Sequence, residues 1–463
     1  MAMMKGFSNV FRIPELRKKI LITLGLVFVC RLISQVPTPG VDWHTLKTVI
    51  DTQTGGGMID WLDVFTGGAL GQCAIGFLSI WPYISASIVI QLLGSVIPTL
   101  SKLRKEGESG RQQLAQITRY LTIVICVVQA WGIATLLSHP EQLGSGFAGM
   151  QIVTNPGIGF HLMTVIGMTT ASLFVMWLAD QITTHGIGNG ASLIIMINIT
   201  SRLPSALFAA WERYFGVGGS TVGTRPIAEL PILILFFVCV VMGTVMLTQG
   251  VRKVAIHTTR RSVSGGNTYG MQQTFMPLRV NYTGVMPIIF ASPLIQIPSA
   301  IILKVTGGAE SGIALWFHDI ASDLARPTST LHIVVYAVLI LFFAFFWVAT
   351  QFNAIDISEN LKKDGSYIPG IRPGRATAEF LDDLMTKITL IGGSGLLVVA
   401  LIPMLLTGIM EVPWVIASFF GGTSLLIIVG VALDTLRVME SHLLVRKYEG
   451  FLSHGTLRGR GGV

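Results

Sequence analysis

The Gly392-Gly-Ser394-Gly segment resembles a catalytic motif, because intramembrane serine proteases carry their serine in a G-x-S-G context. Such a serine needs a histidine base within hydrogen-bond distance. His161 and His332 are predicted at helix ends rather than at the depth of Ser394. We therefore expect no catalytic residue and no enzyme, and glycine at this spacing is typical of close packing between membrane helices.

Two further groups of residues give no sign of cofactor chemistry. The Gly186-Ile-Gly-Asn189-Gly segment has no preceding strand, so it does not fit a dinucleotide-binding turn, and we interpret it as the flexible start of a helix. The four cysteines have neither metal-ligand spacing nor a pairing pattern. They are Cys30, Cys73, Cys126 and Cys239. We expect no cofactor and no metal.

Charged side chains are almost absent from the long apolar stretches. Only 12% of the chain is charged, against about 25% in an ordinary soluble domain, and 51% is hydrophobic. Arg31 and Arg202 lie in the outer parts of their stretches, where a long side chain can reach water. Ion-coupled transporters normally carry charged residues within the membrane. Their absence disfavours proton- or sodium-coupled transport, although backbone carbonyls could still coordinate sodium.

The elements that must position these residues are membrane-spanning helices. About 20 mainly apolar residues are needed for a helix to cross roughly 30 Å of hydrocarbon. Ten stretches of about this length carry few charges. The predicted spans are 20–36, 74–97, 117–137, 159–179, 188–210, 230–248, 283–303, 331–352, 388–407 and 414–434.

Lysine and arginine in the connecting segments predict the orientation of these spans, because cytoplasmic loops carry the excess of basic residues. Alternate connections hold 25 basic residues and the others hold 5. Both termini are therefore predicted in the cytoplasm. With five spans in each half, the two halves enter the membrane from opposite sides. The predicted fold is an all-α polytopic membrane protein of ten transmembrane helices in two inverted five-helix halves.

The predicted organisation has four parts. Residues 1–19 form a cytoplasmic N-terminus, 20–210 the first half, 211–434 the second half and 435–463 a cytoplasmic tail. Inverted halves place a functional site at their interface near the membrane midplane.

A short Gly-rich segment, 59–73, precedes the second span. It is too short and too polar to cross the membrane, so we interpret it as a re-entrant helix at about 62–73. Irregular backbone survives at membrane depth only where protein or a water-filled cavity surrounds it. An ordinary exposed loop is the alternative.

Two predicted cytoplasmic loops, 249–282 and 353–387, are longer or more shaped than orientation alone requires. Loops of more than 30 residues are usually functional. The second loop contains Tyr367-Ile-Pro369-Gly-Ile-Arg372-Pro-Gly374-Arg, whose prolines and glycines favour a fixed turn. We interpret both loops as docking surfaces for a protein or RNA-rich partner, and contact with anionic lipid is the alternative. The candidate docking residues are Arg252, Lys253, Arg260, Arg261 and Arg372.

Several segments together resemble the SecY family, the protein-conducting channels of the bacterial secretion system. The resemblance extends from about residue 15 to 458, and the order of the segments relative to the spans also fits. The segments are Phe65-Thr-Gly-Gly-Ala-Leu70, Pro82-Tyr-Ile-Ser-Ala-Ser-Ile-Val-Ile-Gln91-Leu-Leu, Lys105-Glu-Gly-Glu-Ser-Gly-Arg111, Gly186-Ile-Gly-Asn-Gly, Pro277-Leu-Arg-Val-Asn281, Asn360-Leu-Lys-Lys, Pro369-Gly-Ile-Arg-Pro-Gly374 and Gly421-Gly-Thr-Ser-Leu-Leu426.

The resemblance implies an hourglass pore between the two halves, closed by a ring of apolar side chains. The matching residues are Ile80, Ile84, Ile195, Ile289 and Ile427. An apolar constriction resists wetting and ion passage without binding anything. The resemblance also implies a plug that fills the outer funnel. Its residues would be Asp63, Val64, Phe65, Thr66, Gly67, Gly68, Ala69 and Leu70.

Spans two and seven would form a lateral gate that polar contacts hold shut. The candidate gate residues are Ser85, Gln91, Gln129 and Asn281. Trp81 and Pro293 depart from the family pattern near the gate, and Gly266-Asn267 stands where many relatives carry a basic pair. These departures affect the assignment of the gate contacts and of the docking arginines.

The implied function is a passive conduit, in the cell inner (plasma) membrane, for unfolded preproteins, with sideways release of transmembrane segments into lipid. No nucleotide-binding motif is present, so the driving force must come from outside the chain. The resemblance implies that the SecA ATPase or a translating ribosome supplies it. SecE and SecG are the implied partner subunits, and signal peptides, nascent chains and membrane lipids are further partners. The alternative from another class is an inverted-repeat secondary transporter of a small solute.

Overall fold

The structure is a computed structural model that describes residues 14–42, 66–69, 71–139, 152–215, 229–258, 263–264, 267–268, 273–306 and 312–454. The chain forms two compact units. Unit 1 contains Met1–Thr54, Leu62–Arg202 and Gly430–Val463, and unit 2 contains Gly55–Trp61 and Leu203–Val429. Each unit is described by itself.

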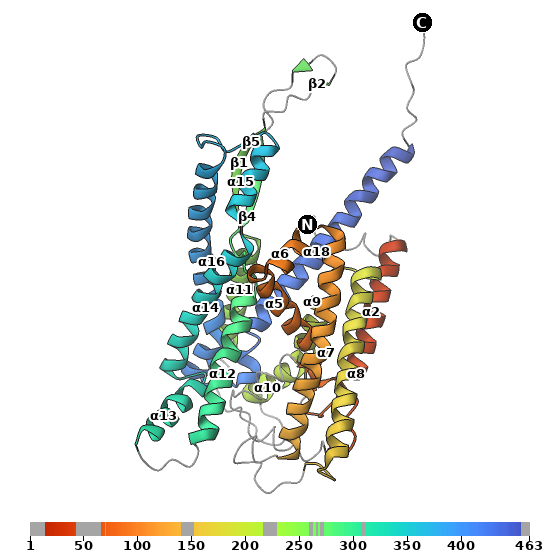
Figure 1. Ribbon diagram of the computed structural model, residues 1–463. Helices are drawn as coiled ribbons and strands as arrows, with labels where there is room; N and C mark the ends of the chain where they lie inside the picture. The colour runs from red at the N-terminus through yellow and green to blue at the C-terminus, as the bar shows by residue number, and fades with distance from the viewer. Residues whose placement is uncertain are drawn as a thin grey trace. The chain divides into compact units, whose positions relative to one another are not determined.

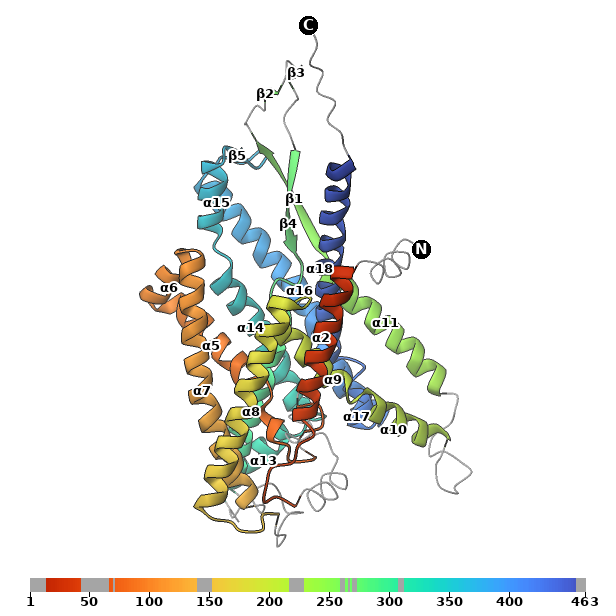
Figure 2. The ribbon, with the colours of Figure 1, turned by 90° about the vertical axis from the view of Figure 1, so that its right-hand side faces the viewer.

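Unit 1 consists of helices. They are α2 (Pro14–Ile33), the short 3-10 helix η1 (Ile75–Leu78), α5 (Trp81–Val96), α6 (Pro98–Lys105), α7 (Glu108–Ser138), α8 (Ile158–His185), α9 (Gly190–Thr200) and the part of α18 (Gly422–His454) from Gly430 onward. Helix α8 packs against both α7 and α2, and these helices run side by side in Figure 1 and Figure 2.

Local sequence explains where several unit 1 helices begin and end. Pro98 is the first residue of α6 and restricts the residue before it to an extended conformation, which ends α5. The side chain of Asn189 caps α9 by accepting a hydrogen bond from the Ser192 amide at 3.2 Å. One apolar core then joins α2, the start of α5, α8 and α9. Its buried members are Cys30, Ile80, Val175, Leu178, Ala179, Ile182, Leu193 and Ile194.

Unit 2 contains the remaining helices and all of the described strands. The helices are α10 (Leu203–Phe215), α11 (Glu229–Gln249), α12 (Met286–Thr306), α13 (Ile313–Ala325), α14 (Thr330–Gln351), α15 (Ala354–Lys363), α16 (Arg375–Ile409), α17 (Trp414–Ala417) and the first turns of α18. Ser329 caps α14 and Asn353 caps α15 through bonds to backbone amides. The core around α12, α14 and α16 is mainly apolar, and its fully buried members include Ile288, Ile340 and Leu396.

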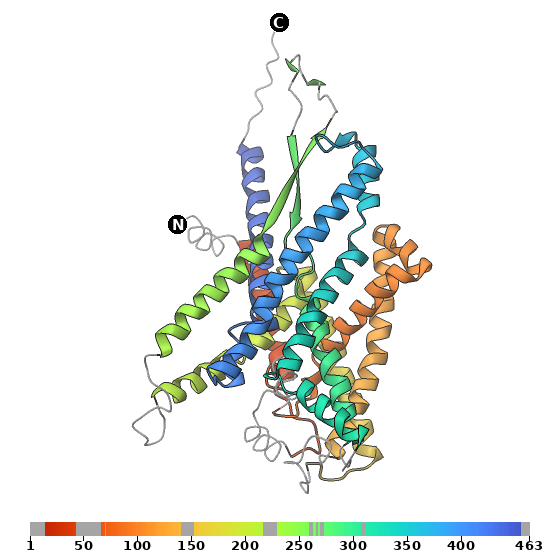
Figure 3. The same cartoon turned by 90° about the vertical axis from the view of Figure 1, so that its left-hand side faces the viewer.

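A small antiparallel sheet also belongs to unit 2. It has the order β4-β1-β5, from β1 (Val251–Thr258), β4 (Gln273–Arg279) and β5 (Ser366–Tyr367), while β2 (Val263–Ser264) pairs separately with β3 (Asn267–Thr268). Val254 of β1 and Leu278 of β4 pack on the first turns of α16, and Figure 3 shows the two long green strands beside that helix. The predicted 249–282 loop is therefore a hairpin in part, which the all-α prediction did not include.

The predicted mainly helical membrane fold is confirmed. Nine helices or helix pairs of the described chain are long and apolar enough to cross a membrane. The first predicted span falls in α2, which is not among these nine and whose sequence includes Arg17, Lys18, Lys19 and Arg31. The fifth predicted span, 188–210, overlaps the candidate span Gly190–Phe215. This stretch is interrupted between Thr200, where α9 ends, and Leu203, where α10 begins, because Pro204 in the first turn of α10 cannot continue a helix from before.

Candidate functional site

Three of the five predicted pore isoleucines lie together in unit 1. Ile80 is 2% exposed and belongs to the core described above, and Ile84 and Ile195 are half-buried against the same core. The Ile80 carbonyl accepts a hydrogen bond from the Ile84 amide at 3.2 Å, so both residues lie on one face at the start of α5. Helix α9 supplies Ile195.

The other two predicted pore residues belong to unit 2. Ile289 lies in the first turn of α12 and is 7% exposed, and Ile427 lies early in α18 and is 4% exposed. A ring formed by all five isoleucines stays a prediction, because it joins residues of both units.

The described part of the predicted plug is the segment 66–69, in which Thr66, Gly67 and Ala69 are buried. Asp63, Val64, Phe65 and Leu70 lie outside the described residues. Two hydrogen bonds hold the backbone that follows this segment. The Ala69 carbonyl accepts a hydrogen bond from the Ala74 amide at 2.9 Å, and the Cys73 carbonyl accepts one from the Thr38 hydroxyl at 2.6 Å.

A group of polar residues surrounds Gly67, and we call it the Arg31 cluster. It consists of Arg31, Gly67, Ser79, Asn198 and Ser201. Arg31 donates from Nη1 to Asn198 Oδ1 and from Nη2 to the Gly67 carbonyl, both at 3.2 Å. Asn198 Nδ2 donates to Ser79 Oγ at 3.0 Å, and Ser201 Oγ lies 3.3 Å from the Gly67 carbonyl.

The sequence did not predict the Arg31 cluster. We expected Arg31 to extend toward water, but its guanidinium is turned inward and half-buried. A charged group at the bilayer centre costs roughly 2.5 to 3.5 kcal/mol on insertion scales. Hydrogen bonds to nearby protein oxygens offset part of this cost. The only signal in the sequence was the pair formed by Arg31 in the first span and a polar Asn198 in the fifth.

The turn between α8 and α9 positions Ile195. The Thr183 hydroxyl donates to the Ala179 carbonyl at 2.9 Å and accepts from the Gly190 amide at 2.9 Å, which joins the end of α8 to the start of α9. A Cβ atom on Gly190 would overlap the Ala179 carbonyl oxygen. The Gly186-Ile-Gly-Asn189-Gly segment is therefore a tightly packed turn rather than the flexible helix start that we predicted.

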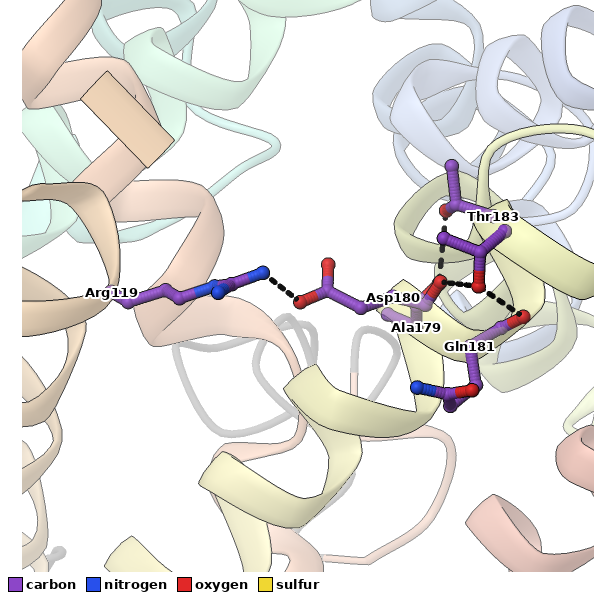
Figure 4. A network of polar contacts seen from close by, with 6 residues as sticks. Arg119, Ala179, Asp180, Gln181 and Thr183 are labelled. Atoms are coloured by element: carbon purple, nitrogen blue, oxygen red, sulfur yellow. Dashed lines mark hydrogen bonds and ion pairs between the residues drawn. The ribbon is translucent and has the colours of Figure 1, made fainter. Parts of the chain in front are cut away.

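An ion pair lies close to this turn. Arg119 of α7 contacts Asp180 of α8 through Nη2 and Oδ2 at 2.7 Å, and Figure 4 shows the pair next to Thr183. The two side chains are 52% and 37% exposed. Because exposed ion pairs contribute only about 0 to 1 kcal/mol, this one orients α7 and α8 more than it stabilises them.

The predicted gate residues occupy both units. In unit 1, the Ser85 hydroxyl donates to the Trp81 carbonyl at 3.1 Å, Gln91 is exposed and Gln129 is half-buried. Gln129 Oε1 is buried and accepts no hydrogen bond from the described residues. In unit 2, Asn281 is 8% exposed and its Oδ1 accepts from the Thr283 hydroxyl at 3.3 Å. Contacts between the two sets stay a prediction.

The predicted docking residues in the described chain are exposed. Arg252 and Lys253 lie on β1, and Arg372 lies in the turn between β5 and α16. Arg260 and Arg261 lie outside the described residues.

Ser394 makes a hydrogen bond within its own helix. Its hydroxyl donates to the Ile391 carbonyl at 2.9 Å, while His332 Nδ1 lies 2.6 Å from the Leu324 carbonyl. A Cβ atom on Gly392 would overlap the Val280 carbonyl oxygen, so this glycine allows the segment after β4 to lie directly on α16. In the described part of the chain, no group of three histidine, cysteine or acidic residues could hold a metal ion.

Comparison with known proteins decides the family. The SecY family model matches residues 74–436. The chain belongs to the SecY family. The protein translocase subunit SecY of Streptomyces scabiei is 40% identical over 452 residues, which cover 97% of this chain and 100% of the relative. The SecY subunit of Escherichia coli (strain K12) is 38% identical over 453 residues, 96% of each chain.

Solved structures show the same fold. A SecY structure described through its plug domain, which stabilises the closed state of the translocation channel, has a TM-score of 0.57, 16% identity and 92% coverage of both chains. The Sec61 channel in a canine ribosome-channel complex has a TM-score of 0.55, 16% identity and coverage of 92% of this chain and 93% of that chain. The chain therefore has the SecY and Sec61 fold.

Proposed function

We propose that this chain is the channel-forming subunit of a Sec translocase, a passive conduit that moves unfolded preproteins across a membrane and releases transmembrane segments sideways into lipid. The observation that carries the proposal is the match to protein translocase subunits over almost the whole chain. The buried isoleucines of the two units and the glycine-rich segment beside the Arg31 cluster support it. The relatives named above give no support to a small-solute transporter.

The proposed partners follow from this role. SecE and SecG are the proposed companion subunits, and the SecA ATPase or a translating ribosome is the proposed source of force. A protein of the same fold, the canine Sec61 channel, is described in a complex with the ribosome. Arg252, Lys253 and Arg372 are exposed and basic, which suits contact with acidic protein surfaces or ribosomal RNA. Signal peptides, nascent chains and lipids are the remaining proposed partners.

We also propose a location and an orientation. The chain is placed in the plasma membrane with both termini in the cytoplasm, because 25 of the basic residues in its connecting segments lie on that side and 5 on the other. The β1–β4 hairpin and α15 then face the cytoplasm, where a motor or ribosome would meet them. The proposed chemistry is conduction alone, without catalysis.

Depletion of the chain tests the proposed function. When its synthesis is shut off in its own cell, precursors that keep their signal peptides should accumulate in the cytoplasm, measured by pulse labelling and immunoprecipitation of an exported protein. A cytoplasmic enzyme synthesised at the same time is the control. Normal processing of the exported protein after the chain has disappeared would overturn the proposal.

A further inference from the structure

We propose that the Arg31 cluster is a latch that holds the plug at Gly67 and that Arg31 and Asn198 are its positioning residues. This inference rests on the proposed channel function. The Gly67 carbonyl receives Arg31 Nη2 at 3.2 Å, and the Ser201 hydroxyl lies 3.3 Å away. Arg31 belongs to α2, and Ser201, whose hydroxyl also lies 2.7 Å from the Asn198 carbonyl, directly follows α9. Residues from two separate helices of unit 1 therefore contact the plug segment.

The guanidinium of Arg31 is oriented by a buried relay. Its Nη1 donates to Asn198 Oδ1 at 3.2 Å, and Asn198 Nδ2 donates to Ser79 Oγ at 3.0 Å. Asn198 is 1% exposed and Ser79 is 4% exposed. Because both ends of the Asn198 amide are engaged, Asn198 holds the guanidinium of Arg31 next to the Gly67 carbonyl.

The strength of the contact suits a latch that must open. Arg31 binds two neutral oxygens, and none of the described carboxylates lies within ion-pair distance of it. The distances of 3.2 Å are at the long end of the usual range for N–H···O bonds. Within the described residues, the contact therefore positions the plug through hydrogen bonds to neutral oxygens.

Gly67 is required at the point of contact. Its φ of +69° is in the left-handed region, and a Cβ atom there would lie 2.7 Å from Arg31 Nη1 and 2.8 Å from the Asn198 carbonyl oxygen. Gly68 has a φ of +89°, but a Cβ atom there would meet nothing within 4 Å. The two glycines share the backbone strain of a side chain and differ in the collision with the latch, which makes Gly68→Ala a matched control for Gly67→Ala.

The test measures how often the purified translocase complex opens in a planar bilayer without a signal peptide, together with export of a reporter whose signal peptide is defective. Gly67→Ala, Arg31→Lys and Asn198→Ala should each raise resting conductance by about tenfold, the effect of losing one hydrogen bond to a charged group. Lysine keeps the charge but cannot hold two acceptors in a fixed fork. Gly68→Ala and Arg119→Lys should stay within about twofold of the unchanged chain, because neither removes a bond of this kind from the latch.

Each outcome decides the matter. Equal conductance of Gly67→Ala and Gly68→Ala, or a closed Arg31→Lys channel, would overturn the latch while the channel function stands. If all three latch variants fail to accumulate and both controls accumulate, the cluster serves assembly and the latch is wrong. Failure of a normal signal peptide to open the unchanged complex would instead reject the proposed channel function.

Discussion

Ile194 and Ile195 are neighbours in α9 with different surroundings. Ile194 is 2% exposed inside the unit 1 core, whereas Ile195, like Ile84, is half-buried against it. A helix turns by about 100° per residue, so adjacent side chains face different directions. Burial therefore separates a residue that holds the unit together from one that is free to line a pore.

Substitution of these neighbours should separate stability from closure. Ile194→Asn should reduce the amount of the chain in the membrane, because it removes a core side chain and buries an amide, at a cost of about 2 to 5 kcal/mol. Ile195→Asn should leave the amount nearly unchanged and raise ion leak and tolerance of defective signal peptides. Immunoblots of membranes and conductance of the purified complex measure the two effects. An Ile195→Asn channel that conducts like the unchanged one would count against the pore assignment.

Residue roles were only partly predictable from the sequence. An apolar residue in a membrane span can face lipid, core or pore, so the five isoleucines could be selected only by resemblance. The Arg31 contact with Asn198 joins residues 167 positions apart, and no local pattern predicts such a pair. Gly67 matched a family segment, but the sequence alone does not show why glycine is needed there. A Cβ atom at this position would collide with Arg31 and Asn198.

At the scale of elements, α16 shows how small residues bring irregular backbone onto a helix. A Cβ atom on Gly392 would overlap the Val280 carbonyl oxygen and lie 3.6 Å from the Asn281 amide, whereas a Cβ atom on Gly393 would make ordinary contacts at 3.4 Å with Ala344 and Leu341. Gly392 thus positions the segment that carries the gate candidate Asn281.

The two glycines should respond differently to the same change. Gly392→Ala should push the segment at Val280 away from α16 and destabilise unit 2 by about 1 to 3 kcal/mol, the usual cost of overpacking. Gly393→Ala should be tolerated. Thermal stability of the purified complex measures both, and a Gly393→Ala variant that is as unstable as Gly392→Ala would show that the collision with Val280 is not the cause.

Most elements were predictable because membrane helices have a simple hydropathy signal. The hairpin was missed, since its basic residues were interpreted only as docking charge. Val254 and Ile256 are buried while Arg252 and Lys253 are exposed, so an alternating pattern was present over only part of β1. The break between α9 and α10 could have been found from Pro204, which we placed inside a span.

At the scale of the whole molecule, the distribution of charge carries most of the information. The 32 basic residues are concentrated in alternate connections, and almost none lies within a predicted span. Such a chain has the means to orient itself but few groups with which to couple to an ion gradient. This is the pattern of a conduit whose driving force comes from a partner.

Fusion of a reporter enzyme that is active only outside the cytoplasm tests the orientation. A fusion after Arg326, between α13 and α14, should be active, and a fusion after Lys363, at the end of α15, should be inactive. A reporter that is active only in the cytoplasm, fused at the same two positions, should give the reverse result. Activity of the same reporter at both positions would contradict the proposed topology.

The residues of the Arg31 cluster are synthesised at different times during translation. Arg31 is synthesised 167 residues before Asn198, which corresponds to roughly ten to thirty seconds of translation at bacterial rates of about 5 to 20 residues per second. After residues 66–69 have been made, the plug segment and the arginine are present, but the amide of Asn198 that orients the guanidinium does not yet exist. If the proposed latch holds the plug, we expect that a partly synthesised chain does not hold its plug in place until Asn198 has been made.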